Sequence, residues 1–211
     1  MATTTTNYGF DIPQSTDLVK DGATAIATLG QDIDTAMNTA LGTKKAGMVL
    51  LNTTSFSGVA SQTINDVFSA TYDNYYIMVS GVSDTTSNGL FLRMRVAGAD
   101  NTSSNYYWSN IYNTSTSPFT VVGNGSSGAG TSWELADAGT RNMAAEAIIY
   151  RPFLSTFNTA YKRSTQLTDA SRNYQWSGGG GMTVNTSYTG FTIFLSANLM
   201  TGSVQTYGFN K

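Results

Sequence analysis

The stretch LFLRMRVAG, residues 90–98, decides the class of fold. Its side chains form two alternating sets: Leu90, Leu92, Met94 and Val96 in one, and Phe91, Arg93, Arg95 and Ala97 in the other. Side chains of a β-strand point alternately to opposite faces, so the aliphatic set shares one face and the mostly cationic set the other. The stretch therefore predicts a half-buried strand with one face in a core.

The same period of two continues along the chain from Met48 to the C-terminus. Turn-forming pairs such as Asp73-Asn74 and Asn88-Gly89 separate the runs. We expect strands near residues 48–56, 62–70, 75–83, 90–98, 105–113, 131–136, 144–151, 160–168, 174–178, 190–198 and 202–209. Many short strands with no helix between them predict an antiparallel β-sandwich, with a jelly roll as the expected form.

Two glycine-rich stretches stand out: VGNGSSGAGT at residues 122–131 and SGGGG at residues 177–181. Neither opens a helix or leads into Lys-Ser or Lys-Thr, so a phosphate-cradling loop is not indicated. We expect flexible loops at the edge of the sandwich. Glycines there also let a ligand or a neighbouring chain approach the backbone.

A helical period precedes the strands, in STDLVKDGATAIATLGQDIDTAMNTAL at residues 15–41. In a seven-residue repeat, the first position holds Val19, Ile26, Ile33 and Ala40, and the fourth holds Gly22, Leu29 and Ala36. Such a narrow apolar seam is typical of a coiled coil. We expect Ser15 or Thr16 to cap the helix and Gly42 to end it. The seam must be buried, either on the helix's own domain or on other copies in a short parallel bundle.

Residues 1–14, MATTTTNYGFDIPQ, form an extended arm before the helix. Tyr8, Phe10 and Ile12 alternate along it, which gives the arm one apolar face. A segment without a core of its own is either a disordered tail or a docking strand for a neighbouring chain. The predicted organisation is an anchoring arm at 1–14, a helical stalk at 15–42 and a β-sandwich head at 43–211.

The composition excludes several classes of function. Only 11% of residues are charged and the formal net charge is -2, so the cationic footprint of a nucleic-acid binder is missing. Histidine and cysteine are absent, which removes disulfides, thiolate metal sites and His-based catalysis. The N-terminus lacks a signal-peptide pattern and no apolar run is long enough for a bilayer. We expect a soluble product of a cytoplasm, without cofactor, metal or membrane insertion.

Carboxylates are the remaining route to catalysis. Two of the acids Glu134, Asp137 and Glu146 can be imagined as a carboxylate pair for glycosidic cleavage, but their spacing does not require that they share a site. No nucleophile has a recognisable base. We therefore predict that the chain is not an enzyme and has no catalytic residue.

Aromatic rings beside amides and hydroxyls are the stronger indication. Ring faces cover the apolar faces of sugars and amides bond their hydroxyls, so we expect a weak glycan site. The candidates are Tyr106, Tyr107, Trp108, Trp176, Asn105 and Asn110. The alternative is that these rings fill the core or a subunit seam. Tyr107 and Trp108 cannot both point inward, and Trp108 is the preferred contact.

Two stretches resemble known proteins. NYGFDIPQSTDLVKDGATAIATLGQDIDTAM, residues 7–37, resembles the N-termini of tailed-bacteriophage virion proteins of the minor tail or fibre class. YDNYYIMVSGVSDTTSNGLFLRMRVAGAD, residues 72–100, is similar to β-sandwich heads of the same class. The resemblance implies a virion structural protein with an N-terminal anchor, a short helical stalk and a C-terminal head. It implies no catalytic residue.

Together these observations predict a homotrimeric tail fibre or spike whose head contacts the host surface, with other virion proteins and a host saccharide as partners. The trimer rests partly on the resemblance. The predicted seam comprises Val19, Ile26, Leu29, Ile33, Ala36 and Ala40, and the predicted virion anchor comprises Tyr8, Phe10 and Ile12. Alternatives are a decoration fibre of the capsid or neck and a tail-associated glycan depolymerase. The depolymerase is less favoured because the chain lacks the internal repeats of a long β-helix.

Overall fold

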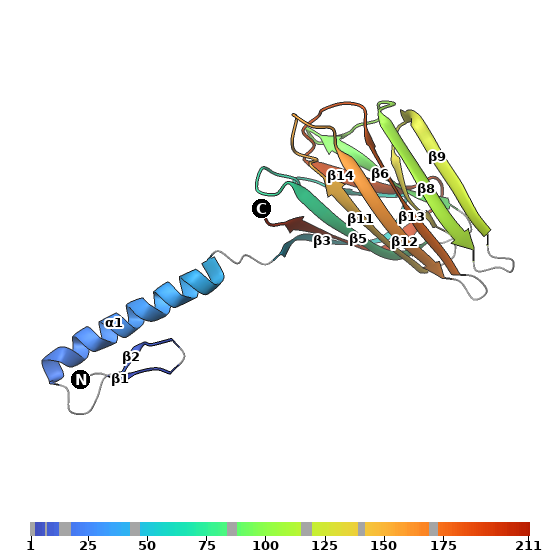
Figure 1. The fold of residues 1–211 in the computed structure, drawn as a ribbon. Helices are drawn as coiled ribbons and strands as arrows, with labels where there is room; N and C mark the ends of the chain where they lie inside the picture. Colours follow the sequence, from blue (N-terminus) through green and yellow to red (C-terminus); the bar gives the residue numbers. More distant parts are fainter. Residues whose placement is uncertain are drawn as a thin grey trace. The chain divides into compact units, whose positions relative to one another are not determined.

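The structure is a computed structural model that describes residues 3–6, 8–12, 18–42, 47–83, 88–114, 120–138, 142–168 and 173–211. The chain divides into two compact units, Met1–Ala46 and Gly47–Lys211 (Figure 1). The predicted arm and stalk therefore lie within one unit, and the predicted head corresponds to the other.

The N-terminal unit contains a short hairpin and a long helix. Strands β1 (Thr3–Thr4) and β2 (Asp11–Ile12) pair antiparallel. Helix α1 (Val19–Met37) follows and continues into a π-helical turn, η1 (Asn38–Gly42). The predicted helix and its end at Gly42 are confirmed, whereas the proposed caps Ser15 and Thr16 lie outside the described residues. Leu18 occupies the N-cap position and makes no side-chain cap.

The arm does not remain an extended strand. It folds into the hairpin, and the rings of Tyr8 and Phe10 stack with their centroids 5.6 Å apart. These two rings share an apolar hollow of about 310 Å³ with side chains of the helix and its last turn: Ile33, Ala36, Met37 and Ala40. The helix thus gives the arm the apolar contact that its own short sequence lacks.

The second unit is a sandwich of two antiparallel sheets, as predicted. The larger sheet has eight strands, in the order β3 (Met48–Val59), β15 (Met200–Phe209), β5 (Asn74–Ser83), β11 (Asn142–Tyr150), β12 (Ala160–Thr168), β13 (Asn173–Met182), β8 (Tyr106–Thr114) and β9 (Thr120–Gly130) (Figure 1). The smaller sheet has five, with β10 (Trp133–Ala138), β6 (Asn88–Val96), β14 (Gly190–Leu195) and β4 (Ser61–Ile64) in order and β7 (Ala99–Asp100) paired to β6. Jelly-roll connectivity stays a prediction.

Strand β6 confirms the alternation at residues 90–96. Leu90, Leu92 and Met94 are fully buried between the sheets. On the outer face, the guanidinium of Arg93 lies 4.3 Å from the ring centroid of Phe194. Val96, at the end of the strand, is exposed. The run at 62–70 is shorter than predicted, because Asp66 takes a positive φ of 54° and turns the chain after β4.

The two glycine-rich stretches are strands, which corrects the expectation of flexible loops. Residues 122–130 belong to β9, at the edge of the larger sheet, and residues 177–181 lie inside β13. Glycine is needed there because the strands lie very close together. A Cβ atom at Gly180 would lie 2.0 Å from the carbonyl oxygen of Tyr107 on β8. Backbone approach, and not flexibility, explains the glycines of β13.

Candidate functional site

The predicted glycan residues do not form one site. Strand β8 turns Tyr106, Trp108 and Asn110 inward, where Tyr106 and Asn110 are buried and Trp108 packs against the core. Tyr107 points the other way and is 42% exposed. The preference for Trp108 is therefore reversed, because the alternation of the strand gives the outward position to Tyr107.

The remaining candidates also have structural roles. Trp176, on the inner face of β13, is buried and stacks on Tyr112 with the ring centroids 4.3 Å apart. Asn105 accepts a hydrogen bond of 3.2 Å from the Thr183 hydroxyl. Burial withdraws Tyr106, Trp176 and Asn110 from any direct contact with a ligand at the surface, which corrects their selection.

Asn110 belongs to a buried polar cluster that joins the two sheets. The Nε atom of Arg163 on β12 donates to Asn110 Oδ1 at 2.7 Å, and Asn110 Nδ2 donates to Glu134 Oε2 at 3.0 Å. Arg163 Nη2 lies 3.6 Å from the same carboxylate oxygen of β10. A Cβ atom at Gly178 would lie 2.1 Å from Asn110 Oδ1, so this glycine leaves room for the cluster.

Two of the carboxylates considered for catalysis lie apart from each other in the sandwich, because only Glu134 belongs to this buried cluster. Glu134 is buried between the sheets, whereas Glu146 is exposed on the outer face of the eight-stranded sheet. The two acids lie on opposite sides of that sheet and cannot flank one glycosidic bond. The side chain of Asp137 lies outside the described residues. Among the described residues, no group of three or more His, Cys, Asp or Glu side chains is placed to hold a metal ion.

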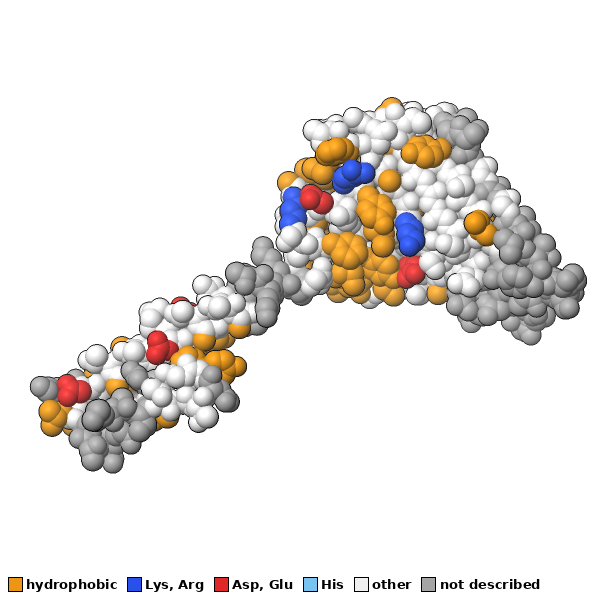
Figure 2. All heavy atoms as spheres, viewed as in Figure 1, with side chains coloured by type: hydrophobic (Ala, Val, Ile, Leu, Met, Phe, Trp, Pro, Cys, Tyr) orange, Lys and Arg blue, Asp and Glu red, His pale blue; other side chains and the backbone are white. Residues whose placement is uncertain are grey.

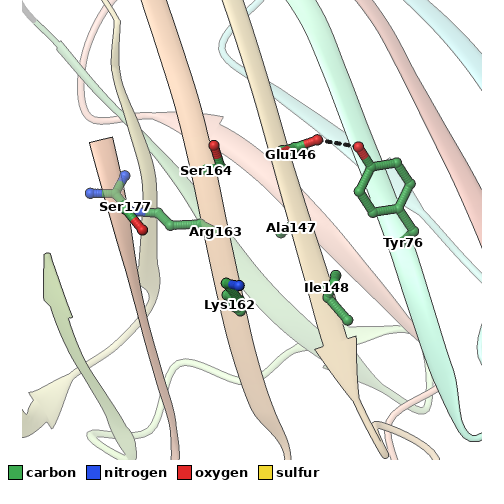
Figure 3. Close-up of a pocket in the computed structure, with 8 residues that line it drawn as sticks. All are labelled: Tyr76, Glu146, Ala147, Ile148, Lys162, Arg163, Ser164 and Ser177. Atoms are coloured by element: carbon green, nitrogen blue, oxygen red, sulfur yellow. Dashed lines mark hydrogen bonds between the residues drawn. The ribbon is translucent and has the colours of Figure 1, made fainter. Parts of the chain in front are cut away.

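A hollow of about 330 Å³ lies on the outer face of the eight-stranded sheet (Figure 3). We call it the outer-face hollow. The side chains that border it come from four adjacent strands: Tyr76 of β5, Glu146 and Ile148 of β11, Lys162 and Ser164 of β12, and Ser177 of β13. Arg163 and Ala147 contribute to the lining from the same strands, but their side chains are buried. The hollow therefore combines an aromatic ring, two opposite charges and two hydroxyls.

Strand register brings these residues together. Ile148 is the partner of both Tyr76 and Lys162, and it stands between them in one row across the sheet. In the next row, Ser164 is the partner of both Glu146 and Ser177. Cross-strand partners on one face lie about 5 Å apart, so residues distant in sequence become neighbours.

The Tyr76 hydroxyl donates a hydrogen bond to the Glu146 carboxylate (Figure 3). Burial, followed by this hydrogen bond and the carboxylate charge, raises the pKa of Tyr76 to about 12. The phenol therefore stays protonated at neutral pH and holds the carboxylate in place. Tyr207 of β15 extends the aromatic surface, with its ring centroid 6.3 Å from that of Tyr76.

The hollow offers hydrogen bonds of both kinds. The Lys162 ammonium donates, the Glu146 carboxylate accepts, and the hydroxyls of Ser164 and Ser177 do both. Figure 2 shows few charged side chains on the drawn face of the head, and basic and acidic ones lie beside each other there among hydrophobic and uncharged polar groups. Such a surface suits an uncharged, polyhydroxylated ligand with apolar ring faces.

The fold defines a class, an antiparallel β-sandwich with one N-terminal helix. None of the described helices is both long and apolar enough to cross a membrane. No protein-family model matches the chain, and no curated protein matches it. A solved structure, the CBM2 module of Lactobacillus casei BL23 phage J-1 evolved Dit, is similar with a TM-score of 0.25 and 10% identity, over 72% of this chain and 69% of that one.

Proposed function

We propose that this chain is a structural protein of a tailed-bacteriophage virion whose head binds a saccharide of the host surface in the outer-face hollow. The observation that carries the binding role is the convergence of Tyr76, Glu146, Lys162 and Ser164 on one open sheet surface. The assignment to a virion rests on the resemblance of residues 7–37 and 72–100. The separation of Glu134 from Glu146 favours binding over hydrolysis.

We expect Tyr76→Ala and Tyr207→Ala each to weaken saccharide binding about tenfold, the equivalent of ~1.4 kcal/mol. Each substitution removes a ring face that would cover the apolar side of a sugar. Binding is measured on a glycan array and by titration, and phage adsorption is measured in parallel. Thermal melts establish that the variants remain folded.

Phe157→Ala is the matched control: Phe157 is also an exposed ring, 51% accessible, but it neither lines the outer-face hollow nor, as Tyr207 does, lies beside Tyr76. It should bind as the parent does. Folded Tyr76 and Tyr207 variants that retain full binding and adsorption would refute the saccharide role of this hollow.

The N-terminal unit is proposed to form a trimer and to attach the protein to the particle. Val19, Ile26 and Ile33 of the seam are 95%, 65% and 40% exposed in the single chain. Val19 and Ile26, seven residues apart and this exposed, favour burial on parallel helices of other copies, whereas Ile33 also borders the hollow that Tyr8 and Phe10 share. Tyr8 is 75% exposed, which leaves it accessible to a neighbouring virion protein. Three heads on one stalk would raise avidity roughly a hundredfold or more over one site.

We expect Ile26→Asp to convert the full-length trimer to smaller species, because a buried unpaired charge in each subunit costs several kcal/mol. Thr24→Asp is the matched control, since it adds the same charge two residues away at an exposed position outside the seam. Light scattering gives the masses. A monomeric parent, or an Ile26→Asp protein that keeps the trimer mass, would contradict the seam.

A further inference from the structure

The outer-face hollow is one part of a longer trough in the eight-stranded sheet. The strands between β5 and β8 carry small outward residues near the middle of the sheet: Ala144, Ser164, Ser177 and Gly179. The strands on either side carry larger exposed ones. Met78 of β5 is 39% exposed, and Tyr107 and Ile111 of β8 are 42% and 61% exposed. On the floor these small residues alternate with Glu146, Ile148 and Lys162, and large apolar residues stand on the strands at its two sides.

The glycine run of β13 keeps this floor bare. Gly179 is the strand partner of Lys162 on one side and of Ser109 on the other, so it continues the outward row without a side chain. A Cβ atom at Gly181 would lie 2.6 Å from the Tyr107 hydroxyl oxygen, which places this ring over Gly181. Within SGGGG, Gly178 and Gly180 face the core and admit close packing, Gly181 lies under Tyr107, and Gly179 leaves the outer surface bare.

The trough extends along the strands as well as across them. A second hollow, of about 210 Å³, is bordered by Met78, Ser80 and Ala144 and shares Glu146 and Ser164 with the outer-face hollow. From Ala144 to Ile148 the floor runs four residues along β11, roughly 13 Å at the rise of a strand. Glu146 and Ser164 stand where the two hollows meet, and each end combines apolar and polar groups: Tyr76, Ile148 and Lys162 at one, and Met78, Ala144 and Ser80 at the other.

We infer that the trough binds an interior segment of a linear polysaccharide, at least two rings long, lying along β11 and β12. This inference rests on the proposed saccharide function and adds the class of ligand. One ring occupies the outer-face hollow beside Tyr76, and the next occupies the second hollow beside Met78. Glu146 and Ser164 lie at the junction and contact both rings. Recognition of a chain interior requires no reducing or non-reducing end.

The test uses the full-length protein and ladders of one to six rings of β-1,4-linked N-acetylglucosamine and α-1,4-linked glucose, together with any uncharged polymer that a glycan array detects. We expect affinity to rise at least tenfold from one ring to three and then to level off. Ser80→Trp fills the second hollow and should remove the gain that added rings bring, so that three rings bind no more tightly than one. Ser55→Trp, also an exposed serine on this sheet but on edge strand β3, should behave as the parent does.

The outcomes separate the two proposals. Equal affinity for one ring and three, or equal weakening of both by Ser80→Trp, overturns the extended site and leaves the saccharide function standing. Absence of binding to every ladder and array saccharide overturns both.

Discussion

Replacing Arg163 with alanine is expected to lower the free energy of unfolding of the head by about 3–5 kcal/mol. The side chain of Arg163 is wholly buried between the sheets, where it bonds Asn110 and lies 3.6 Å from the Glu134 carboxylate. Its guanidinium also lies 5.0 Å from the ring centroid of Trp176. Removing it leaves a buried carboxylate without its cation, which costs much more than the lost contacts alone.

Lys162→Ala is the control for this prediction. Lys162 precedes Arg163 on the same strand, but its side chain points to the outer face, so the change should stay within about 0.5 kcal/mol. Denaturant melts at neutral pH give both values. The double variant Arg163→Met with Glu134→Leu should regain most of the loss, because it removes both charges together. A single Arg163→Ala variant as stable as Lys162→Ala would show that the cluster does not contribute to stability.

Lys162 and Arg163 also show how much of the structure can be predicted from the sequence. A period of two predicts that Lys162 and Arg163 face opposite sides of a strand, but both are cationic and neither is marked as the buried one. The buried position becomes favourable only because β8 and β10 bring Asn110 and Glu134 to it. Both partners come from other strands, and their register is not encoded locally.

The candidate site was likewise predictable only in part. Strands at 75–83, 144–151 and 160–168 were predictable from their alternation. The row of Tyr76, Ile148 and Lys162 was not, because it depends on which strands are neighbours and in which register. Glycine was misleading at residues 177–181, since composition favours a loop wherever side chains are few. A dense run of glycines between predicted strands can equally mark close backbone packing, and that signal was present.

Alkaline pH is expected to lower the free energy of unfolding of the head, because tyrosines buried in its core resist ionisation. Burial raises the pKa of Tyr106 and of Tyr161, and each hydroxyl is held inside the sandwich. Tyr106 accepts a hydrogen bond from the Met94 amide at 3.0 Å and donates one of 2.9 Å to the Asn101 carbonyl oxygen. Tyr161 donates to the carbonyl oxygen of Glu134 at 3.1 Å. Ionising either phenol places a charge inside the sandwich, where the cost of burial exceeds what the Met94 amide and the Arg163 cation return.

Because the pKa values of these tyrosines are raised by folding, stability falls as the pH rises. The stability that these tyrosines contribute is fully present below their unfolded pKa of about 10 and is lost as the pH rises toward the folded values. In that window the unfolded chain releases protons that the folded chain retains. Each tyrosine therefore lowers the free energy of unfolding by about 1.4 kcal/mol per pH unit, and the two together by about 3. The pKa values of Tyr75 and Tyr188 are raised by burial too, so they act in the same direction.

Denaturant melts at several pH values between about 8 and 12 measure this slope, and tyrosinate absorbance reports when the phenols ionise. From pH 10 to pH 12 the two tyrosines would remove about 5 kcal/mol, which is the lower end of a typical total stability of about 5–15 kcal/mol, and ionisation of the buried rings should coincide with loss of structure. Tyr106→Phe removes one titrating group and should reduce the slope by about 1.4 kcal/mol per pH unit, whatever it does to stability at neutral pH. If these phenols instead ionise near pH 10 in a head that stays folded, their hydroxyls are accessible to water and are not packed between the two sheets.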